Sequence, residues 1–313
     1  MLSRTADHLY WMARYTERAE NMSRLLDVSH RMSLQLPGAE IGYWGAALGI
    51  TGLEPVYTAK YGPITGANVL RFMAVDLDNS SSILSSLRSA RENCHAVRGT
   101  VTSEVWETIN TTWLEARDSV SAKLQAGGPE SALVEYLEWV KFRSHLSRGV
   151  TVGTMLQDES FHFIRLGTFL ERADNTARLL DVKFDELAPK EGEGNEYYEW
   201  GALLRSVSAF EIYRKVYRDV ITPRRVAELL ILRDDMPRSL HSCLKEVHQI
   251  LAQVANARSD ETRRRAGGAY SRLQYGRIED ILELGLHRYL TEFLDETADL
   301  GNRIAQDFLV PMS

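Results

Sequence analysis

Two stretches of the chain carry the same run of polar side chains, a Glu-Arg pair followed by Asn and then Arg at intervals of three residues. Its members are Glu17, Arg18, Asn21 and Arg24 in the first stretch and Glu171, Arg172, Asn175 and Arg178 in the second. On a helix, Glu17 and Asn21 lie one turn apart and can meet a shared partner. A guanidinium group binds a planar carboxylate or phosphate through two parallel hydrogen bonds. These eight residues are therefore the candidate binding set.

Two roles for this run remain open. Buried Glu-Arg pairs that tie helices together are common, and such a brace predicts that both stretches behave alike. A site for a carboxylate or peptide ligand predicts a cleft in one stretch or where the two meet. No catalytic residue is assigned, because the adjacent arginines oppose the raised carboxyl pKa that Glu17 or Glu171 would need as a general base.

The two runs belong to a longer internal repeat. Residues 8–28 and 162–182 align with ten identities in twenty-one positions, whereas composition alone gives roughly one or two. The period is far longer than the roughly 20–50 residues of a solenoid repeat. The sequence therefore predicts two domains, 1–155 and 156–313, each a copy of one multi-helix unit.

Later positions continue this alignment with small shifts in register. The matched positions are Trp44 with Trp200, Thr65 with Thr222, and Tyr136-Leu137 with Tyr289-Leu290. The repeat therefore extends over both halves of the chain.

Turn residues, rather than strand-like alternation, divide each copy into segments. The predicted breaks are Leu36–Gly38, Lys60–Pro63, Arg98–Gly99, Gly127–Pro129 and Ala188–Asn195. Thr222-Pro223 predicts a helix start, because a capping hydroxyl precedes proline at the first helical position. The expected fold is all-α, with two tandem pseudo-symmetric multi-helix units packed as a helical bundle.

A helical wheel of residues 4–30 places an apolar stripe on one side and the polar run on the other. Glu17, Asn21 and Arg24 lie opposite the stripe, and Arg18 lies at the flank. The second copy has the same layout. The wheel therefore predicts a polar face that both copies share.

Composition excludes several classes of protein. The net charge of -6 argues against a nucleic-acid-binding protein, which needs a concentrated positive field. No window approaches the roughly 20 apolar residues of a membrane span. Cys94 and Cys243 lie far apart, which indicates a reducing compartment, and the N-terminus lacks the layout of a secretion signal. We therefore expect a cytoplasmic protein that binds neither nucleic acid nor membrane.

No metal and no cofactor are predicted. Helix bundles hold metal ions through Glu-x-x-His motifs, and two such motifs occur, Glu92–His95 and Glu159–His162. Neither pair is repeated in the other copy, and chance accounts for about one match. Phosphate-binding Gly-rich loops and the nucleophile elbow of hydrolases are absent.

The opening segment, residues 2–21, resembles the signature start of the bacterial alpha-E family, and residues 169–178 resemble its second signature. The resemblance covers essentially the whole chain. Its main departure is His8, where the family more usually has asparagine. The resemblance implies a helical domain whose two copies form one alpha-E unit.

The family is commonly encoded beside, or fused to, a circularly permuted ATP-grasp ligase. This association implies the synthesis or modification of a peptide or amide, with Glu17, Arg18, Glu171 and Arg172 as functional positions. Because the chain has no ATP-binding motif of its own, nucleotide chemistry would belong to the ATP-grasp partner.

We therefore expect an accessory or substrate- or partner-binding helical protein of an ATP-grasp amide-ligase system. One alternative is an enzyme that uses Glu/Arg acid–base chemistry on a carboxylate or peptide substrate. Another is a structural scaffold that forms homo-oligomers.

Overall fold

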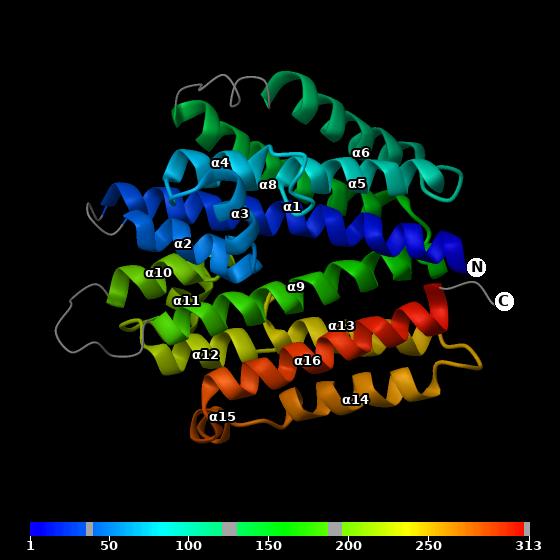
Figure 1. The fold of residues 1–313 in the computed structure, drawn as a ribbon. Coiled ribbons are helices and arrows are strands. Elements are labelled where there is room, and N and C mark those ends of the chain that lie inside the picture. The colour runs from blue at the N-terminus through cyan, green and yellow to red at the C-terminus, as the bar shows by residue number, and fades with distance from the viewer. Residues whose placement is uncertain (36–39, 121–129, 187–195, 310–313) are drawn as a thin grey trace. The chain divides into compact units, whose positions relative to one another are not determined.

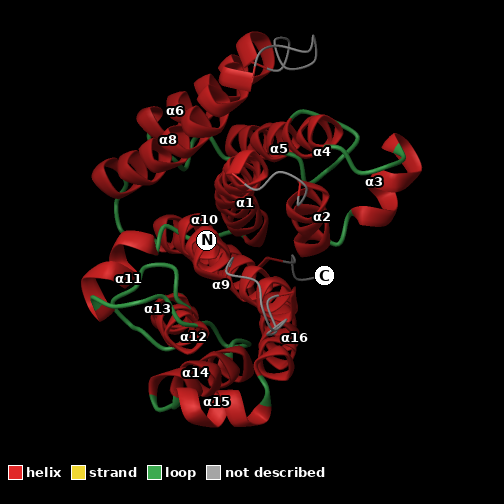
Figure 2. Ribbon diagram, turned by 90° about the vertical axis from the view of Figure 1, so that its left-hand side faces the viewer, coloured by secondary structure: helices red, strands yellow, loops and turns green. Residues whose placement is uncertain are grey.

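The all-α prediction is confirmed by a computed structural model, which describes residues 1–35, 40–120, 130–186 and 196–309. These ranges contain 15 α-helices and no strand (Figure 2). Three predicted breaks lie outside the described residues, namely Leu36–Gly38, Gly127–Pro129 and Ala188–Asn195.

The chain divides into two compact units, Met1–Thr168 and Phe169–Ser313 (Figure 1). The helices of the first unit are α1 (Ser3–Gln35), α2 (Glu40–Thr51), α3 (Glu54–Tyr61), α4 (Gly66–Ala74), α5 (Ile83–Ala96), α6 (Ser103–Glu115) and α8 (Glu130–Thr154). α9 (Glu159–Glu186) begins in the first unit and continues into the second. It is followed by α10 (Glu196–Ser206), α11 (Phe210–Tyr217), α12 (Pro223–Ile231), α13 (Leu240–Gln253), α14 (Asp260–Gln274), α15 (Ile278–Leu284) and α16 (Leu286–Ile304).

Local signals set several helix ends as predicted. α3 ends at Tyr61, and Gly62 then takes a φ of 73°, a left-handed conformation that glycine adopts without steric cost. α5 ends at Ala96, and α6 starts after the predicted break at Arg98–Gly99. The expected start of α12 is confirmed, because the Thr222 side chain accepts a hydrogen bond from the backbone N–H of Arg225.

α1 is the central helix of the first unit. It packs against α2, α4, α5 and α8, which surround it in Figure 2. Apolar residues such as Leu9 and Leu26 are fully buried, but Glu17 and Asn21 are also only 1% and 4% exposed. The polar face that the helical wheel predicts is therefore buried in the first copy. α8 covers the side of α1 that carries Glu17.

The same turn occurs once in each unit, before α4 and before α12. The Tyr57 hydroxyl donates to the carbonyl of Pro63 and accepts from the backbone N–H of Thr65. The Tyr213 hydroxyl likewise donates to the carbonyl of Val220 and accepts from the N–H of Thr222. Thr65 and Thr222 then cap the following helices.

Helix lengths also correspond. α2 to α5 have 12, 8, 9 and 14 residues, and α10 to α13 have 11, 8, 9 and 14. Together with the repeated turn, these lengths support the predicted duplication.

Candidate functional site

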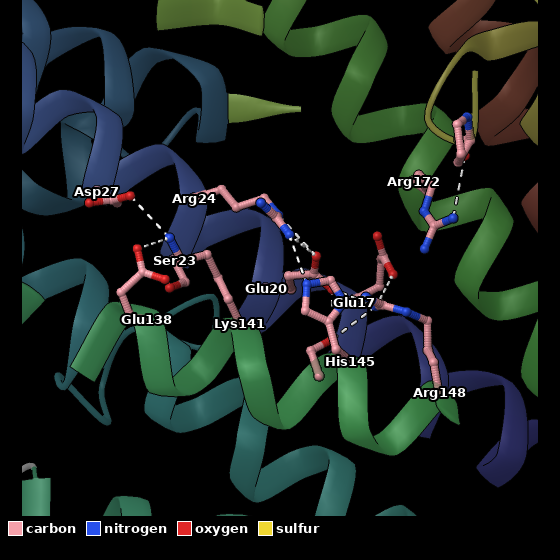
Figure 3. Close-up of polar contacts among 12 residues, drawn as sticks. Glu17, Glu20, Ser23, Arg24, Asp27, Glu138, Lys141, His145, Arg148 and Arg172 are labelled. Atoms are coloured by element: carbon pink, nitrogen blue, oxygen red, sulfur yellow. Dashed lines mark hydrogen bonds and ion pairs between the residues drawn. The ribbon is translucent and has the colours of Figure 1, made fainter. Parts of the chain in front are cut away.

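A polar seam runs between α1 and α8 in the first unit. Glu17, Glu20 and Arg24 of α1 face Lys141, His145 and Arg148 of α8 (Figure 3). Glu17 and Glu20 are 1% and 0% exposed, so both carboxylates are buried. A buried carboxylate must be compensated by hydrogen bonds or opposite charge, so the partners of these two residues define the seam.

Arg148 compensates both carboxylates. Its Nη1 atom donates to Glu17 Oε2 at 3.0 Å and to Glu20 Oε2 at 2.5 Å. The Ser144 hydroxyl, one turn earlier on α8, donates to the same Glu20 oxygen at 2.8 Å. Charge-assisted bonds of this kind are about twice as strong as neutral ones, which makes Arg148 the main link between α8 and the centre of α1.

Arg24 adds to this compensation from α1 itself. Its Nε atom donates to Glu20 Oε1 at 2.9 Å, four residues along the same helix. Glu20 therefore accepts from Arg24 on one oxygen and from Arg148 on the other. Two carboxylates and two guanidinium groups balance in charge, as a buried ionic cluster requires.

His145 lies at the exposed edge of this cluster, between the two arginines. Its Nδ1 atom is 2.7 Å from Arg148 Nη2, and its Nε2 atom is 3.2 Å from Arg24 Nη2. His145 is exposed, whereas the side chains of Arg24 and Arg148 are 12% and 27% exposed. Three nitrogen-bearing groups therefore converge where the seam reaches solvent.

A second ionic group continues the seam toward the end of α1. Asp27 accepts from Arg31 Nε at 2.8 Å and from Lys141 Nζ at 3.0 Å. Lys141 also donates to Glu138 at 2.6 Å. Burial raises the pKa of Asp27, but the hydrogen bonds from Arg31 and Lys141 outweigh this effect and hold the pKa below its ordinary value.

The predicted residues of the first run separate into two groups. Glu17 and Arg24 belong to the seam. The guanidinium group of Arg18 instead lies 5.4 Å from the ring centre of Tyr15, in a cation–π contact. Asn21 is buried on the same helix. The seam thus includes part of the run and adds residues of α8.

In the second run, the guanidinium group of Arg172 lies 5.4 Å from the ring centre of Phe169, the same contact that Arg18 makes with Tyr15. Glu171 and Arg172 are buried, and Arg172 donates to the carbonyl of Pro237 at 3.3 Å. Arg178 forms an exposed ion pair with Asp174 at 2.8 Å. Asn175 is half-buried. The two runs therefore share the cation–π contact and the ion pair to an acidic residue one turn earlier, and they differ in the exposure of the second arginine, 12% for Arg24 and 49% for Arg178.

A further difference between the copies lies in the sequence of the last long helix. Counting twelve residues from Tyr136 leads to Arg148, and counting twelve from its match Tyr289 leads to Gly301. α16 therefore has no guanidinium group at the position from which Arg148 reaches α1.

Seven residues of the seam were not singled out from the sequence, namely Glu20, Arg31, Glu138, Lys141, Ser144, His145 and Arg148. Glu20 did carry a signal, because Asp174 is acidic at the matching position and each precedes an arginine by four residues. For Arg148 no local pattern exists, since Glu17 lies 131 residues away along the chain.

Other types of site are not found in the described part of the chain. Its residues include no group of three or more His, Cys, Asp and Glu side chains that could hold a metal ion. None of its helices combines the length and apolar character needed to cross a membrane.

The fold and the seam define a class of protein, an all-helical domain with a Glu-Arg pair on its first helix. The Alpha-E family model, described as a predicted alpha-helical domain with a conserved ER motif, matches residues 1–309. The chain therefore belongs to the Alpha-E family.

Three relatives come from Mycobacterium bovis and from two strains of Mycobacterium tuberculosis, and each is named only as an uncharacterized protein. Each is 25% identical to the chain over 310 residues, and the match covers 93% of the chain but 35% of the relative. The chain thus spans about a third of the length of these curated relatives. No solved structure matches it.

Proposed function

We propose that the chain is a non-catalytic, substrate-binding partner in an ATP-grasp amide-ligase system. It binds a carboxylate group of the peptide or amide substrate at the exposed edge formed by Arg24, His145 and Arg148. The observation that carries this proposal is the position of His145, whose two ring nitrogens each face a guanidinium nitrogen.

One imidazole ring cannot accept hydrogen bonds from both arginines. A neutral ring has a single acceptor nitrogen, a protonated ring has none, and a guanidinium group has only donors. One of the two contacts at His145 therefore places two donors face to face. A carboxylate at this edge would accept from several of these donors and relieve the mismatch.

The charge of the cluster favours a monoanion. Arg24 and Arg148 are balanced by Glu17 and Glu20, so a ligand with one negative charge meets donors without a large excess of positive charge. A doubly charged phosphate would also lie near two carboxylates and be disfavoured by their repulsion. The buried glutamates hold both guanidinium groups in position before the ligand arrives, which lowers the entropy cost of binding.

The class of partner rests on the resemblance to alpha-E proteins that accompany ATP-grasp ligases. The lengths of the relatives are consistent with such a partnership, because the matched region is one part of a longer polypeptide in each of them. The alternative of acid–base catalysis has less support. Glu17 is 1% exposed and accepts a hydrogen bond from Arg148, so it meets neither substrate nor solvent directly.

The binding proposal can be tested by calorimetric titration with N-acetyl-alanyl-alanine, which has one carboxylate, and with its C-terminal amide, which has none. We expect the acid to bind and the amide to bind roughly tenfold more weakly or not at all. His145→Ala changes an exposed side chain and should weaken acid binding by a similar factor while the chain stays folded. His287→Ala removes an exposed histidine of α16 and should leave binding unchanged.

Equal binding of acid and amide, or unchanged binding by His145→Ala, would overturn the carboxylate site. The partnership is tested separately by mixing the chain with the circularly permuted ATP-grasp protein encoded beside it. We expect co-elution at micromolar concentration and slower amide formation with His145→Ala. A lack of both association and any effect on the ligase would favour the scaffold alternative.

A further inference from the structure

The second unit contains a cleft that plays no part in the seam. Residues of α14 and α16 line it, together with Leu244 of α13. Figure 1 shows where these three helices lie in the second unit. Its volume is about 460 Å³, within the roughly 300–1,000 Å³ of typical ligand pockets. The cleft is therefore large enough for a small peptide.

The floor of the cleft is apolar. Leu244, Phe293 and Leu300 line it and are nearly fully buried. Gly268 lines the cleft from the middle of α14, where glycine destabilises a helix relative to alanine. A Cβ atom at Gly268 would meet only Arg272 Nη1, at 3.8 Å, so packing does not require the glycine. Gly268 is exposed, so its absent side chain leaves the cleft open on the solvent side, beside Arg272.

Ion pairs cross the mouth of the cleft from α14 to α16. Arg265 Nη1 is 2.8 Å from Asp299 Oδ2, and Arg272 pairs with Glu296. The four side chains are 44% to 57% exposed. Exposed pairs of this kind contribute little to stability and exchange readily with other charged groups.

The comparable position in the first unit is closed. Between α1, α5, α6 and α8 the space amounts to about 10 Å³. Arg143 of α8 fills the gap and donates to Thr112 Oγ1 at 2.7 Å and to the carbonyl of Thr108 at 2.9 Å. The space among α5, α6 and α8 of the first unit is thus filled, whereas the space among α13, α14 and α16 of the second unit is an open cleft.

We propose that this cleft is a second binding site, for a short zwitterionic peptide with an apolar side chain. The apolar side chain lies on Leu244, Phe293 and Leu300, and the exposed Gly268 leaves room for the peptide backbone. The terminal carboxylate replaces Glu296 on Arg272, and the terminal ammonium group binds the carboxylates of α16. The site is distinct from the carboxylate edge at His145 and does not depend on the proposed function.

Charge complementarity selects this ligand class. The rim presents three arginines of α14 and three acidic residues of α16, so it offers separate partners to both ends of a zwitterion. An anionic ligand would pair with the arginines but leave the carboxylates that it displaces without a new partner. A cationic ligand would leave the displaced arginines without one. A ligand without charge would interrupt the ion pairs and replace neither of them.

Titration with alanyl-leucyl-alanine tests the site, with its N-acetylated and C-amidated forms and with trialanine as comparisons. We expect blocking of either end, or replacement of leucine by alanine, to weaken binding roughly tenfold. The experiment uses the His145→Ala chain as well as the unmodified chain, so that binding at the other edge is recognised.

Gly268→Leu provides the decisive variant, because it places a large side chain from a good helix former in the open side of the cleft. We expect it to remain folded and to lose binding, whereas Gln274→Leu, an exposed change at the end of α14 outside the cleft, should bind as before. The proposal is overturned if Gly268→Leu binds like the unmodified chain, if free and doubly blocked peptides bind alike, or if no binding occurs at about 10 mM peptide.

Discussion

Glu20, which is fully buried in α1, accepts a hydrogen bond at 2.5 Å from Nη1 of Arg148 in α8. The same nitrogen reaches Glu17, so one guanidinium group compensates two buried carboxylates. This arrangement makes the stability of the first unit depend on Arg148. It also fixes the position of the arginine that we propose as a ligand contact.

Replacing Arg148 by alanine should destabilise the chain by about 3–5 kcal/mol, because both buried glutamates lose a charged partner. Denaturant unfolding followed by circular dichroism measures this change. Arg178→Ala is the matched control, since it removes a guanidinium group from an exposed pair and should cost less than about 1 kcal/mol. Equal costs for the two variants would contradict the role of Arg148.

Two glycines in helices should respond in opposite ways to alanine. At Gly167 a Cβ atom would overlap the backbone carbonyl of Tyr10, so Gly167→Ala should destabilise the chain by about 1–3 kcal/mol. Gly268→Ala meets no such obstacle and should stabilise it by about 0.5–1 kcal/mol. Thermal unfolding of both variants gives the sign of each effect. Destabilisation by Gly268→Ala would show that the space beside Gly268 is not open.

The repeated turn predicts matching losses in the two units. Tyr57→Phe and Tyr213→Phe each remove a hydroxyl that bonds two backbone groups, so each should cost about 1–3 kcal/mol. Tyr275→Phe, at a position 78% exposed, should cost almost nothing. Urea denaturation compares the three variants. A large effect at one turn and none at the other would count against structural equivalence of the units.

Acid should weaken the contribution of Asp27 to stability. Its pKa is lowered in the folded chain, so the residue adds stability above the unfolded pKa of about 3.9 and loses it as pH falls through the lower folded value. Asp27→Asn should therefore be less stable than the unmodified chain at neutral pH, and the difference should shrink below about pH 4. Unfolding curves at several pH values, with exposed Glu283→Gln as control, measure this. A difference that stays constant with pH would contradict the linkage.

Much of the fold could be predicted because its signals are local. Gly62 ends α3 and Thr222 begins α12 within the breaks expected from sequence, since turns and caps depend on neighbouring residues. The burial of α1 could not be predicted in this way. A polar side chain such as Glu17 is placed inside only by a partner from α8, far along the chain.

The candidate site was predictable only in part for the same reason. Glu17 and Arg24 are both among the candidate binding residues, and both lie in the seam, where Arg148 contacts Glu17 and Glu20 and Arg24 contacts Glu20. Arg148 and His145 could not be found, because no spacing rule connects α1 with α8. The duplication stays a prediction that the repeated tyrosine turn supports, and Gly301 at the position matching Arg148 shows where two copies would differ.

The carboxylate edge is tested most directly by nuclear magnetic resonance of a chain labelled at its eight histidines. N-acetyl-alanyl-alanine and its C-terminal amide are added in separate titrations. We predict that the ring signals of His145 shift with the acid and not with the amide, while those of exposed His287 stay in place. Unmoved His145 signals, or equal shifts with acid and amide, would contradict the proposed binding of a carboxylate between Arg24 and Arg148.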